Sequence, residues 1–397
     1  MKTVFLSTAL AVFILSGNVC RAAEDSRAQY PPWLSNSYIG FNIGYVKQTF
    51  THVQLERGYQ ASTIENPKLM VSVTLFGHHF NKNFSAQLTY KRPVHWVRYK
   101  NINGITSEHT VRTNLASITG RATAPIGSLF SIYAEGGLGI VTRSGFNLEN
   151  RNIVKDANYP TMLLGTGLQY RLSDSLDLQT SIAYAPPNKS FMQPHTFLVS
   201  SGIVFNMRPL SAEKVKNIAQ LGVIFPKNLV QIGYATNTFG TGVNRFVSRA
   251  KIFWGGSHEV THGVTLRYQR NVFHTKKIFS LDLGVSAANW RGAKNQISFY
   301  TFSLFPQFRF TLIRLKQIDL YLGYSLAGPT YITKTITDGR DIGQRFTFQD
   351  LLGLGWYMGK QRHINMEVGI GHFSNGNIFP QNPSVKVPLT FTVGYTF

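Results

Sequence analysis

The stretch FSLDLGVS at residues 279–286 decides the fold of this chain. Phe279, Leu281, Leu283 and Val285 alternate there with Ser, Asp, Gly and Ser. Because successive side chains of a β-strand point to opposite faces, this period of two predicts a strand with one apolar and one polar face. Such strands form the wall of a membrane barrel, with lipid on one side and a polar interior on the other.

The same alternation recurs along the chain in two groups of eight segments. The segments of the first group lie near residues 37–50, 68–80, 83–99, 108–124, 129–147, 159–172, 175–186 and 194–207. Those of the second group lie near residues 228–238, 261–272, 278–290, 297–313, 317–330, 345–358, 362–374 and 386–397. Eight is the smallest common number of strands in an outer-membrane barrel. The pattern therefore predicts an all-β fold of the outer-membrane antiparallel β-barrel class.

The connections between these segments alternate in length, as short periplasmic turns and long outer loops do in such barrels. Residues 208–227 interrupt the pattern with Pro209, Pro226 and a polar run, which predicts a linker with one short helix. Periodicity alone also permits one sixteen-stranded barrel, since closure is a long-range property. The linker favours two tandem eight-stranded barrels, at residues 36–207 and 228–397.

The first residues are typical of an export signal. A charged residue precedes an apolar run from Val4 to Leu15, and small residues follow it, which predicts a signal peptide at residues 1–23. The run is too short to cross a bilayer as a helix, and no later stretch reaches the roughly 18 apolar residues that a membrane helix needs. We therefore expect a barrel in the outer membrane of a Gram-negative bacterium. The terminal Phe397 resembles an assembly signal, so we expect the barrel assembly machinery as a partner.

The formal net charge of the chain is +22. In a cytosolic protein this excess would suggest nucleic acid, but an exported chain first meets the phosphates of lipopolysaccharide. We therefore expect no nucleic-acid partner. Two interpretations of the basic residues stay open, namely solvation of the loops and contact with anionic lipid headgroups.

The main candidate catalytic residues lie in the stretch GHFSNGNIFPQNP at residues 371–383. His372 and Ser374 are two apart on a predicted strand, so they project from one face, and His372 could act as a base on Ser374. They share that face with Ile364 and Val368, which predicts the lipid-facing wall near the outer end of the barrel. A polar pair there is costly unless it has a use or a partner. The alternative is a pair in the interfacial girdle that hydrogen-bonds loop backbone.

This segment resembles the lipid A 3-O-deacylase (PagL), or acyloxyacyl hydrolase-like, family, and the resemblance extends over the C-terminal half. The matching residues are His372, Phe373, Ser374, Asn375, Gly376, Asn382 and Pro383. The resemblance implies a serine esterase acting on lipid A of lipopolysaccharide, with neither cofactor nor metal. In that family pattern Ser374 would be the nucleophile, His372 the general base and Asn375 an oxyanion donor. The N-terminal half resembles a generic small OmpA or opacity-type barrel.

One position departs from the family pattern. The family often has a Glu just before the final strand, and this chain has Lys386 there, with no acidic residue after Glu367. Asp350 is a candidate replacement, because it shares a face with apolar residues of the preceding strand. A turn centred near residue 360 would place Asp350 opposite Ile370, as a diagonal neighbour of His372. Asn377 or Asn382 could also orient the histidine, as Asn does in some Cys-His enzymes.

The sequence also contains His258-Glu259-Val260-Thr261-His262, which has the letters of a zinc motif. That motif works on a helix, whereas glycines flank these residues and an alternating segment follows, so we expect a loop without zinc. Three functions remain in view. An esterase is favoured over a non-enzymatic structural or adhesive barrel with a degenerate deacylase domain, and a single wide pore is the third.

Overall fold

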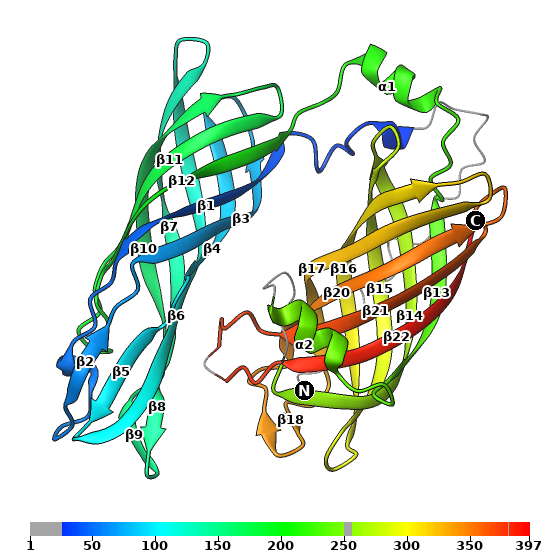
Figure 1. The fold of residues 1–397 in the computed structure, drawn as a ribbon. Coiled ribbons are helices and arrows are strands. Elements are labelled where there is room, and N and C mark those ends of the chain that lie inside the picture. The colour runs from blue at the N-terminus through cyan, green and yellow to red at the C-terminus, as the bar shows by residue number, and fades with distance from the viewer. Residues whose placement is uncertain (1–25, 250–255, 380) are drawn as a thin grey trace, which may run out of the picture.

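The computed structural model describes residues 26–249, 256–379 and 381–397. The predicted signal peptide, residues 1–23, lies outside the described residues. The strands form two separate barrels that stand side by side, with a linker joining them at one end (Figure 1). One sixteen-stranded barrel is therefore wrong, because each ring closes on itself. The pore interpretation, which needed that wide ring, falls with it.

The N-terminal barrel is a ring of eight antiparallel strands within the described part of the chain. Strands that are consecutive in the ring pair with each other, and β12 closes the ring by pairing with β1. The strands are β1 (Ser37–Lys47), β3 (Leu69–His79), β4 (Phe84–Pro93), β6 (Ile105–Ile126), β7 (Phe130–Ser144), β10 (Ala157–Arg171), β11 (Leu176–Ala185) and β12 (Thr196–Met207).

Beyond the ring, the N-terminal barrel carries an extension built mainly from residues that lie between the predicted segments. Strands β2 (Ala61–Glu65) and β5 (Val97–Ile102) pair with each other, and β5 pairs with the first part of β6. Strands β8 (Phe146–Leu148) and β9 (Arg151–Val154) form a separate small hairpin. The extension has its own apolar core, which includes Phe50, Tyr99, Val111 and Ile153. That core explains why these segments order instead of remaining loops.

The C-terminal barrel is also a closed ring of eight strands among the described residues. Strand β22 closes it by pairing with β13. Strand β14 begins at His258, so the residues with the zinc-motif letters lie in a strand and not in the predicted loop. The strands are β13 (Asn228–Thr236), β14 (His258–His274), β15 (Phe279–Gly292), β16 (Ser298–Arg314), β17 (Ile318–Ile332), β20 (Phe346–Met358), β21 (Ile364–Ser374) and β22 (Val385–Thr396). Strands β18 (Ile336–Thr337) and β19 (Arg340–Asp341) form a small hairpin outside the ring.

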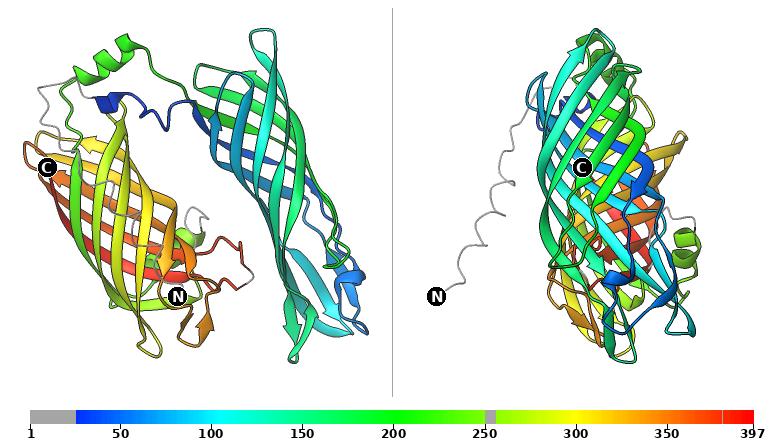
Figure 2. Two further views of the ribbon diagram at one scale, coloured as in Figure 1. Left: turned by 180° about the vertical axis from the view of Figure 1, so that it is seen from behind. Right: turned by 90° about the vertical axis from the view of Figure 1, so that its left-hand side faces the viewer.

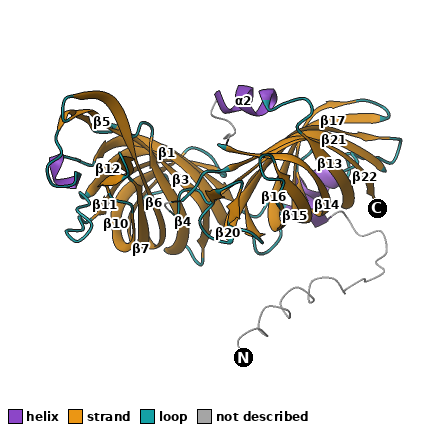
Figure 3. Cartoon of the chain, turned by 90° about the horizontal axis from the view of Figure 1, so that it is seen from below, coloured by secondary structure: helices purple, strands orange, loops and turns teal. Residues whose placement is uncertain are grey.

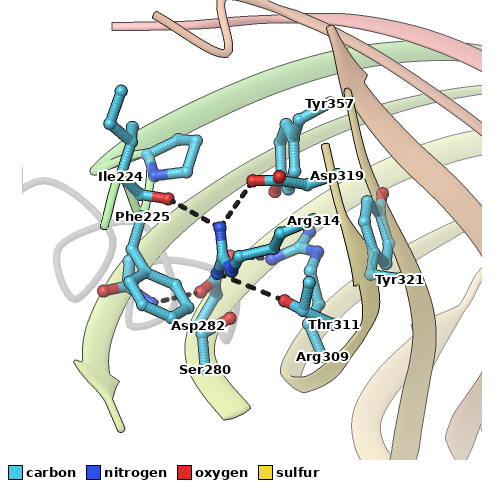
Figure 4. Close-up of a pocket in the computed structure, with 12 residues that line it drawn as sticks. Ile224, Phe225, Ser280, Asp282, Arg309, Thr311, Arg314, Asp319, Tyr321 and Tyr357 are labelled. Atoms are coloured by element: carbon cyan, nitrogen blue, oxygen red, sulfur yellow. Dashed lines mark hydrogen bonds and ion pairs between the residues drawn. The ribbon is translucent and has the colours of Figure 1, made fainter. Parts of the chain in front are cut away.

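Polar side chains fill the interior of the C-terminal barrel. Arg267 donates to Glu367 at 3.1 Å, and Arg309 pairs with Asp282. A cavity of about 10 Å³ lies beside Arg309 and Asp282 (Figure 4). It is at the end of the barrel opposite His372. Such a volume is about that of one water, so the side chains at this end of the barrel are closely packed.

The linker closes the mouth of the C-terminal barrel at that end. Helix α1 (Ala212–Ala219) begins after Ser211, whose side chain accepts from the backbone of Lys214. Phe225 then stacks on His274, with ring centroids 4.4 Å apart. Arg314 donates to the carbonyl of Ile224 (Figure 4). The short helix matches the expectation from sequence. The linker joins the ends of both barrels that carry the short turns, so their outer loops point the same way (Figure 2).

Three further helical segments lie among the described residues. The 3₁₀ turn η1 (Ser26–Ala28) packs near α1 and β14, and η2 (His52–Gln54) lies in the extension. Helix α2 (Gly242–Arg249) lies outside the C-terminal ring at its outer end (Figure 3). The side-chain amide of Asn244 donates to the carbonyl of Val387 at 3.0 Å, which fixes α2 against β22. No helix of the described residues is long and apolar enough to cross a bilayer.

Candidate active site

The faces of β21 are set by what its alternate side chains contact. Asn365 and Glu367 point inward, where they bond Gln231 and Arg267 from strands of the ring. Phe373 joins an inner apolar cluster that also contains Trp290 and Phe299. Because alternate residues of a strand face opposite sides, His372 and Ser374 project from the outer face, as their parity predicts.

Asp350 and His372 face each other across the β20–β21 pair. The Oδ2 atom of Asp350 lies 3.1 Å from Nδ1 of His372. The predicted register, with Asp350 opposite Ile370, is therefore wrong by two residues, although the predicted face is right. The turn spans residues 359–363 instead of 359–361, and Arg362 anchors it by donating to the carbonyl of Gly359.

This outer-face pair is shielded although it points away from the interior. His372 is 3% exposed and Asp350 is 6% exposed. The backbone N–H of Ala327 donates to the Oδ1 atom of Asp350 at 2.7 Å. Ala327 has a φ of 54° beside an irregularity between Ser325 and Gly328, which turns its N–H away from the strand ladder. The carboxylate thus has a donor on each oxygen, which holds its orientation.

Asn382 holds the Ser374 hydroxyl. Its side-chain nitrogen donates to Oγ of Ser374 at 2.9 Å, and the hydroxyl donates back to its amide oxygen at 3.3 Å. The backbone N–H of Gly376 also donates to that Oγ, at 3.2 Å. Asn382 bonds the side chain of Asn377 as well, at 3.0 Å. The loop after β21 is therefore folded around the serine by a side chain seven or eight residues downstream.

Asn375 lies directly beside the serine and is nearly fully buried. Its backbone N–H donates to the amide oxygen of Asn382 at 3.2 Å, and its side-chain amide donates to the carbonyl of Gln381 at 2.7 Å. The side-chain amide of Asn375 has two N–H donors, and this bond to Gln381 engages one of them. The backbone N–H of Gly376 points at Oγ of Ser374, whereas that of Asn375 points at the amide oxygen of Asn382, which also accepts from Ser374.

Residues 262–396 match the lipid A 3-O-deacylase (PagL) family model. Residues 34–205 match the model of the OmpA-like transmembrane domain. We therefore refer to the second barrel as the PagL-like barrel and to the first as the OmpA-like barrel. Both matches and both closed rings make this chain an outer-membrane protein of a Gram-negative bacterium, as predicted. No curated protein matches the chain.

Several solved structures resemble part of the chain. The outer-membrane enzyme PagL is 15% identical, with 43% of this chain and 99% of that chain covered and a TM-score of 0.31. The N-terminal barrel domain of OprF from Pseudomonas aeruginosa is 14% identical, with 43% and 98% covered and a TM-score of 0.29. Neisserial surface protein A is 14% identical, with 43% and 97% covered and a TM-score of 0.29.

Lys386 of the PagL-like barrel faces His372 from the strand opposite to Asp350. Lys386 pairs with His372 in the β21–β22 register, and its ammonium lies 2.6 Å from the carboxylate of Glu259. Glu259 reaches it because β14 runs parallel to β22 for two residues beyond the end of β13. A row of ionisable side chains, Asp350, His372, Lys386 and Glu259, therefore crosses four strands of the outer face. Sequence reasoning did not identify Glu259 or the N–H of Ala327 as members of the site, because neither position carries a motif for this role.

The residues that match the zinc motif in sequence form other contacts in the structure. His258 is buried, and its Nε2 atom lies 2.9 Å from the hydroxyl of Thr337, while Glu259 bonds Lys386. On a strand, the side chains of His258 and His262 are separated by four residues of extended chain, or about 13 Å. The described residues contain no group of three or more His, Cys, Asp and Glu side chains that could hold a metal ion.

Proposed function

We propose that the PagL-like barrel is a serine esterase that removes an ester-linked acyl chain from lipid A. The observation that carries the proposal is the contact of the Asp350 carboxylate with Nδ1 of His372, on the face that also bears Ser374. A carboxylate at Nδ1 fixes the tautomer in which Nε2 accepts a proton, and it stabilises the imidazolium that follows. The family match is the second support.

The proposed reaction proceeds in two halves. The Ser374 hydroxyl turns from Asn382 toward His372, and its Oγ attacks the ester carbonyl while its proton passes to Nε2 of His372. The bond between the acyl carbon and the sugar oxygen then breaks, and the imidazolium returns the proton to the sugar alkoxide that leaves. A water then repeats the steps on the acyl-enzyme, releasing the fatty acid and restoring Ser374. The proposed donors to the oxyanion are the backbone N–H of Gly376, which the turning hydroxyl releases, and the second N–H of the Asn375 side-chain amide.

The outer-face position suits an amphipathic substrate. Ser374 ends β21 at the side of the barrel that carries the long loops, where the headgroups of the outer leaflet lie. An acyl chain of lipid A can reach a serine there without leaving the membrane. The low exposure of His372 and Asp350 keeps their pair away from water, which strengthens its electrostatic effect.

Mass spectrometry of lipid A incubated with the purified full chain tests this proposal. Loss of one acyl mass with the wild type, and no loss with Ser374→Ala or His372→Ala, is the expected result. Unchanged lipid A with folded wild-type protein would contradict an esterase.

A second candidate function is a structural or adhesive barrel with a retired site. Lys386 favours it, because a cation stands where the family pattern has an acid. The engagement of the Ser374 hydroxyl with Asn382 also favours it. The same assay separates the two candidates, since a retired site leaves lipid A intact in all three proteins.

A further inference from the structure

A polar row on the outer wall of the OmpA-like barrel has no role in the proposed chemistry. Tyr90, Asn114, Thr142 and Asn158 lie on the neighbouring strands β4, β6, β7 and β10. Thr142 is 2% exposed and Asn114 is 5% exposed, although the outer wall of such a barrel faces lipid. Polar groups on that wall are costly unless they are bonded. Something other than lipid therefore covers Asn114 and Thr142.

The row is covered by the loop that surrounds Ser374. The hydroxyl of Tyr90 donates to the carbonyl of Gly376 at 2.6 Å, and that of Thr142 donates to the carbonyl of Ile378 at 2.8 Å. Asn158 bonds the same carbonyl of Ile378. The loop between β21 and β22 reaches from the PagL-like barrel toward the OmpA-like barrel (Figures 1 and 2). The two barrels therefore meet at the proposed active site.

A cleft of about 370 Å³ opens beside this contact. Both barrels contribute to it, with β6 on one side and α2, β22 and the loop after β21 on the other. Asn382, which bonds Ser374, lines the cleft, so the cleft adjoins the proposed nucleophile. Its lining residues with polar or charged side chains are Arg112, Arg245, Ser248, Ser257, Asn382, Ser384 and Lys386.

Cations dominate the charge around the cleft. Glu259 bonds Lys386 and lies within electrostatic reach of Arg245. Neither Arg112 nor Arg245 forms a salt bridge among the described residues. Arg92 lies within electrostatic reach of Arg112, which adds a further positive charge. Cations gathered at one opening repel one another, and a bound anion removes that repulsion.

We propose that this cleft binds a phosphate group of the glycolipid substrate, with Arg112 from the OmpA-like barrel and Arg245 from α2 as its ligands. Arginine suits phosphate because its planar donors match two phosphate oxygens at once. The phosphate holds the sugar beside Asn382 and directs an ester toward Ser374. This inference rests on the proposed function for the identity of the ligand, and it gives the OmpA-like barrel a part in binding the substrate.

Direct binding tests the cleft without hydrolysis. The full chain with Ser374→Ala is titrated with lipid A that carries both phosphates and with the same lipid A after dephosphorylation. We expect the phosphorylated form to bind at least about 10-fold more tightly, the gain expected from charge-assisted hydrogen bonds. The preference should disappear in the variant that adds Arg112→Gln and Arg245→Gln. Equal binding of the two lipids, or a preference that survives the substitutions, overturns the proposal.

Two matched controls guard against nonspecific charge effects. Arg249→Gln removes a charge from the same helix, and Arg151→Gln removes an exposed charge from the OmpA-like barrel, both outside the cleft. Both should keep the preference for the phosphorylated lipid. A control that loses it as strongly as Arg112→Gln overturns the assignment of the cleft. A competition experiment with inorganic phosphate separates the two sources of phosphate. If inorganic phosphate competes as well as lipid A at equal concentration, the ligand is free phosphate and not the headgroup.

Kinetics then separate this inference from the proposed function. If the wild type deacylates both lipids with the same KM, the esterase proposal is supported and the phosphate-binding cleft is contradicted. If the wild type deacylates neither lipid while the binding preference depends on Arg112, the phosphate-binding cleft is supported and the esterase proposal is contradicted. We expect Arg112→Gln to raise KM about 10-fold for phosphorylated lipid A, with kcat and the KM for dephosphorylated lipid A unchanged.

Discussion

Oδ2 of Asp350 lies 3.1 Å from Nδ1 of His372, across the pair of strands β20 and β21. The N–H of Ala327 holds the other carboxylate oxygen. Asp350→Asn keeps this shape but replaces an acceptor with a group that can favour the wrong histidine tautomer. We therefore expect kcat for lipid A deacylation to fall by about 10² to 10⁴, the upper figure being that of a serine protease triad.

The matched control for Asp350→Asn is Asp341→Asn, which changes an exposed carboxylate of the same barrel in β19. Initial rates of fatty-acid release, measured for folded protein only, compare the two. If Asp350→Asn works as fast as Asp341→Asn, Asp350 is not the orienting acid.

Asn382 is the expected support of both Ser374 and the backbone of Asn375. Asn382→Ala frees the loop, so the N–H groups proposed for the oxyanion lose their fixed direction. We expect kcat to fall by about 10² to 10³, the range found when one oxyanion donor is removed. The rate and the thermal midpoint are measured together. A large loss of kcat with an unchanged midpoint supports the role, and an unchanged kcat contradicts it.

Much of this site could be predicted from sequence, because a period of two sets the face of every residue in a strand. That reasoning placed Asp350 and His372 on one face. It missed their direct pairing because the register depends on a five-residue turn held by Arg362. It also missed Glu259, which meets Lys386 only because β14 extends past β13. Contacts of that kind arise from how a barrel closes, and local periodicity contains no information about them.

Glu259 is expected to protect the site from the charge of Lys386. Without Glu259, an uncompensated ammonium faces His372, which becomes cationic in the proposed reaction. Glu259→Gln should lower kcat by roughly 3- to 10-fold, less at high salt because Glu259 is partly exposed. The double variant with Lys386→Met should recover the rate. Measuring kcat for the four proteins at two salt concentrations gives the coupling of the pair, and additive effects would show that Glu259 acts independently of Lys386.

Glu367 tests whether the candidate site lies on the outer face of the barrel. Its side chain points into the barrel and pairs with Arg267 at 3.1 Å. Both side chains are buried, so Glu367→Gln leaves an arginine without its charge partner. We expect a loss of about 3 kcal/mol in the free energy of unfolding. Urea titration in detergent micelles measures it. Deacylation per folded molecule should stay at the wild-type level, and a loss of kcat in fully folded protein would contradict the outward assignment of the site.

The contact between the two barrels gives the last prediction. Tyr90 of the OmpA-like barrel donates to the carbonyl of Gly376, two residues after Ser374. Tyr90→Phe removes this bond, together with the bond to Oδ1 of Asn114, and keeps the ring, so the loop around the serine loses one anchor. We expect kcat/KM to fall by about 2- to 10-fold, which corresponds to one ordinary hydrogen bond. Tyr45→Phe is the matched control, since Tyr45 lies exposed on the outer wall of the same barrel. The two variants should unfold at the same temperature. If both keep the wild-type kcat/KM, the OmpA-like barrel does not position the loop, and if both lose it, the effect is a general one on the barrel wall.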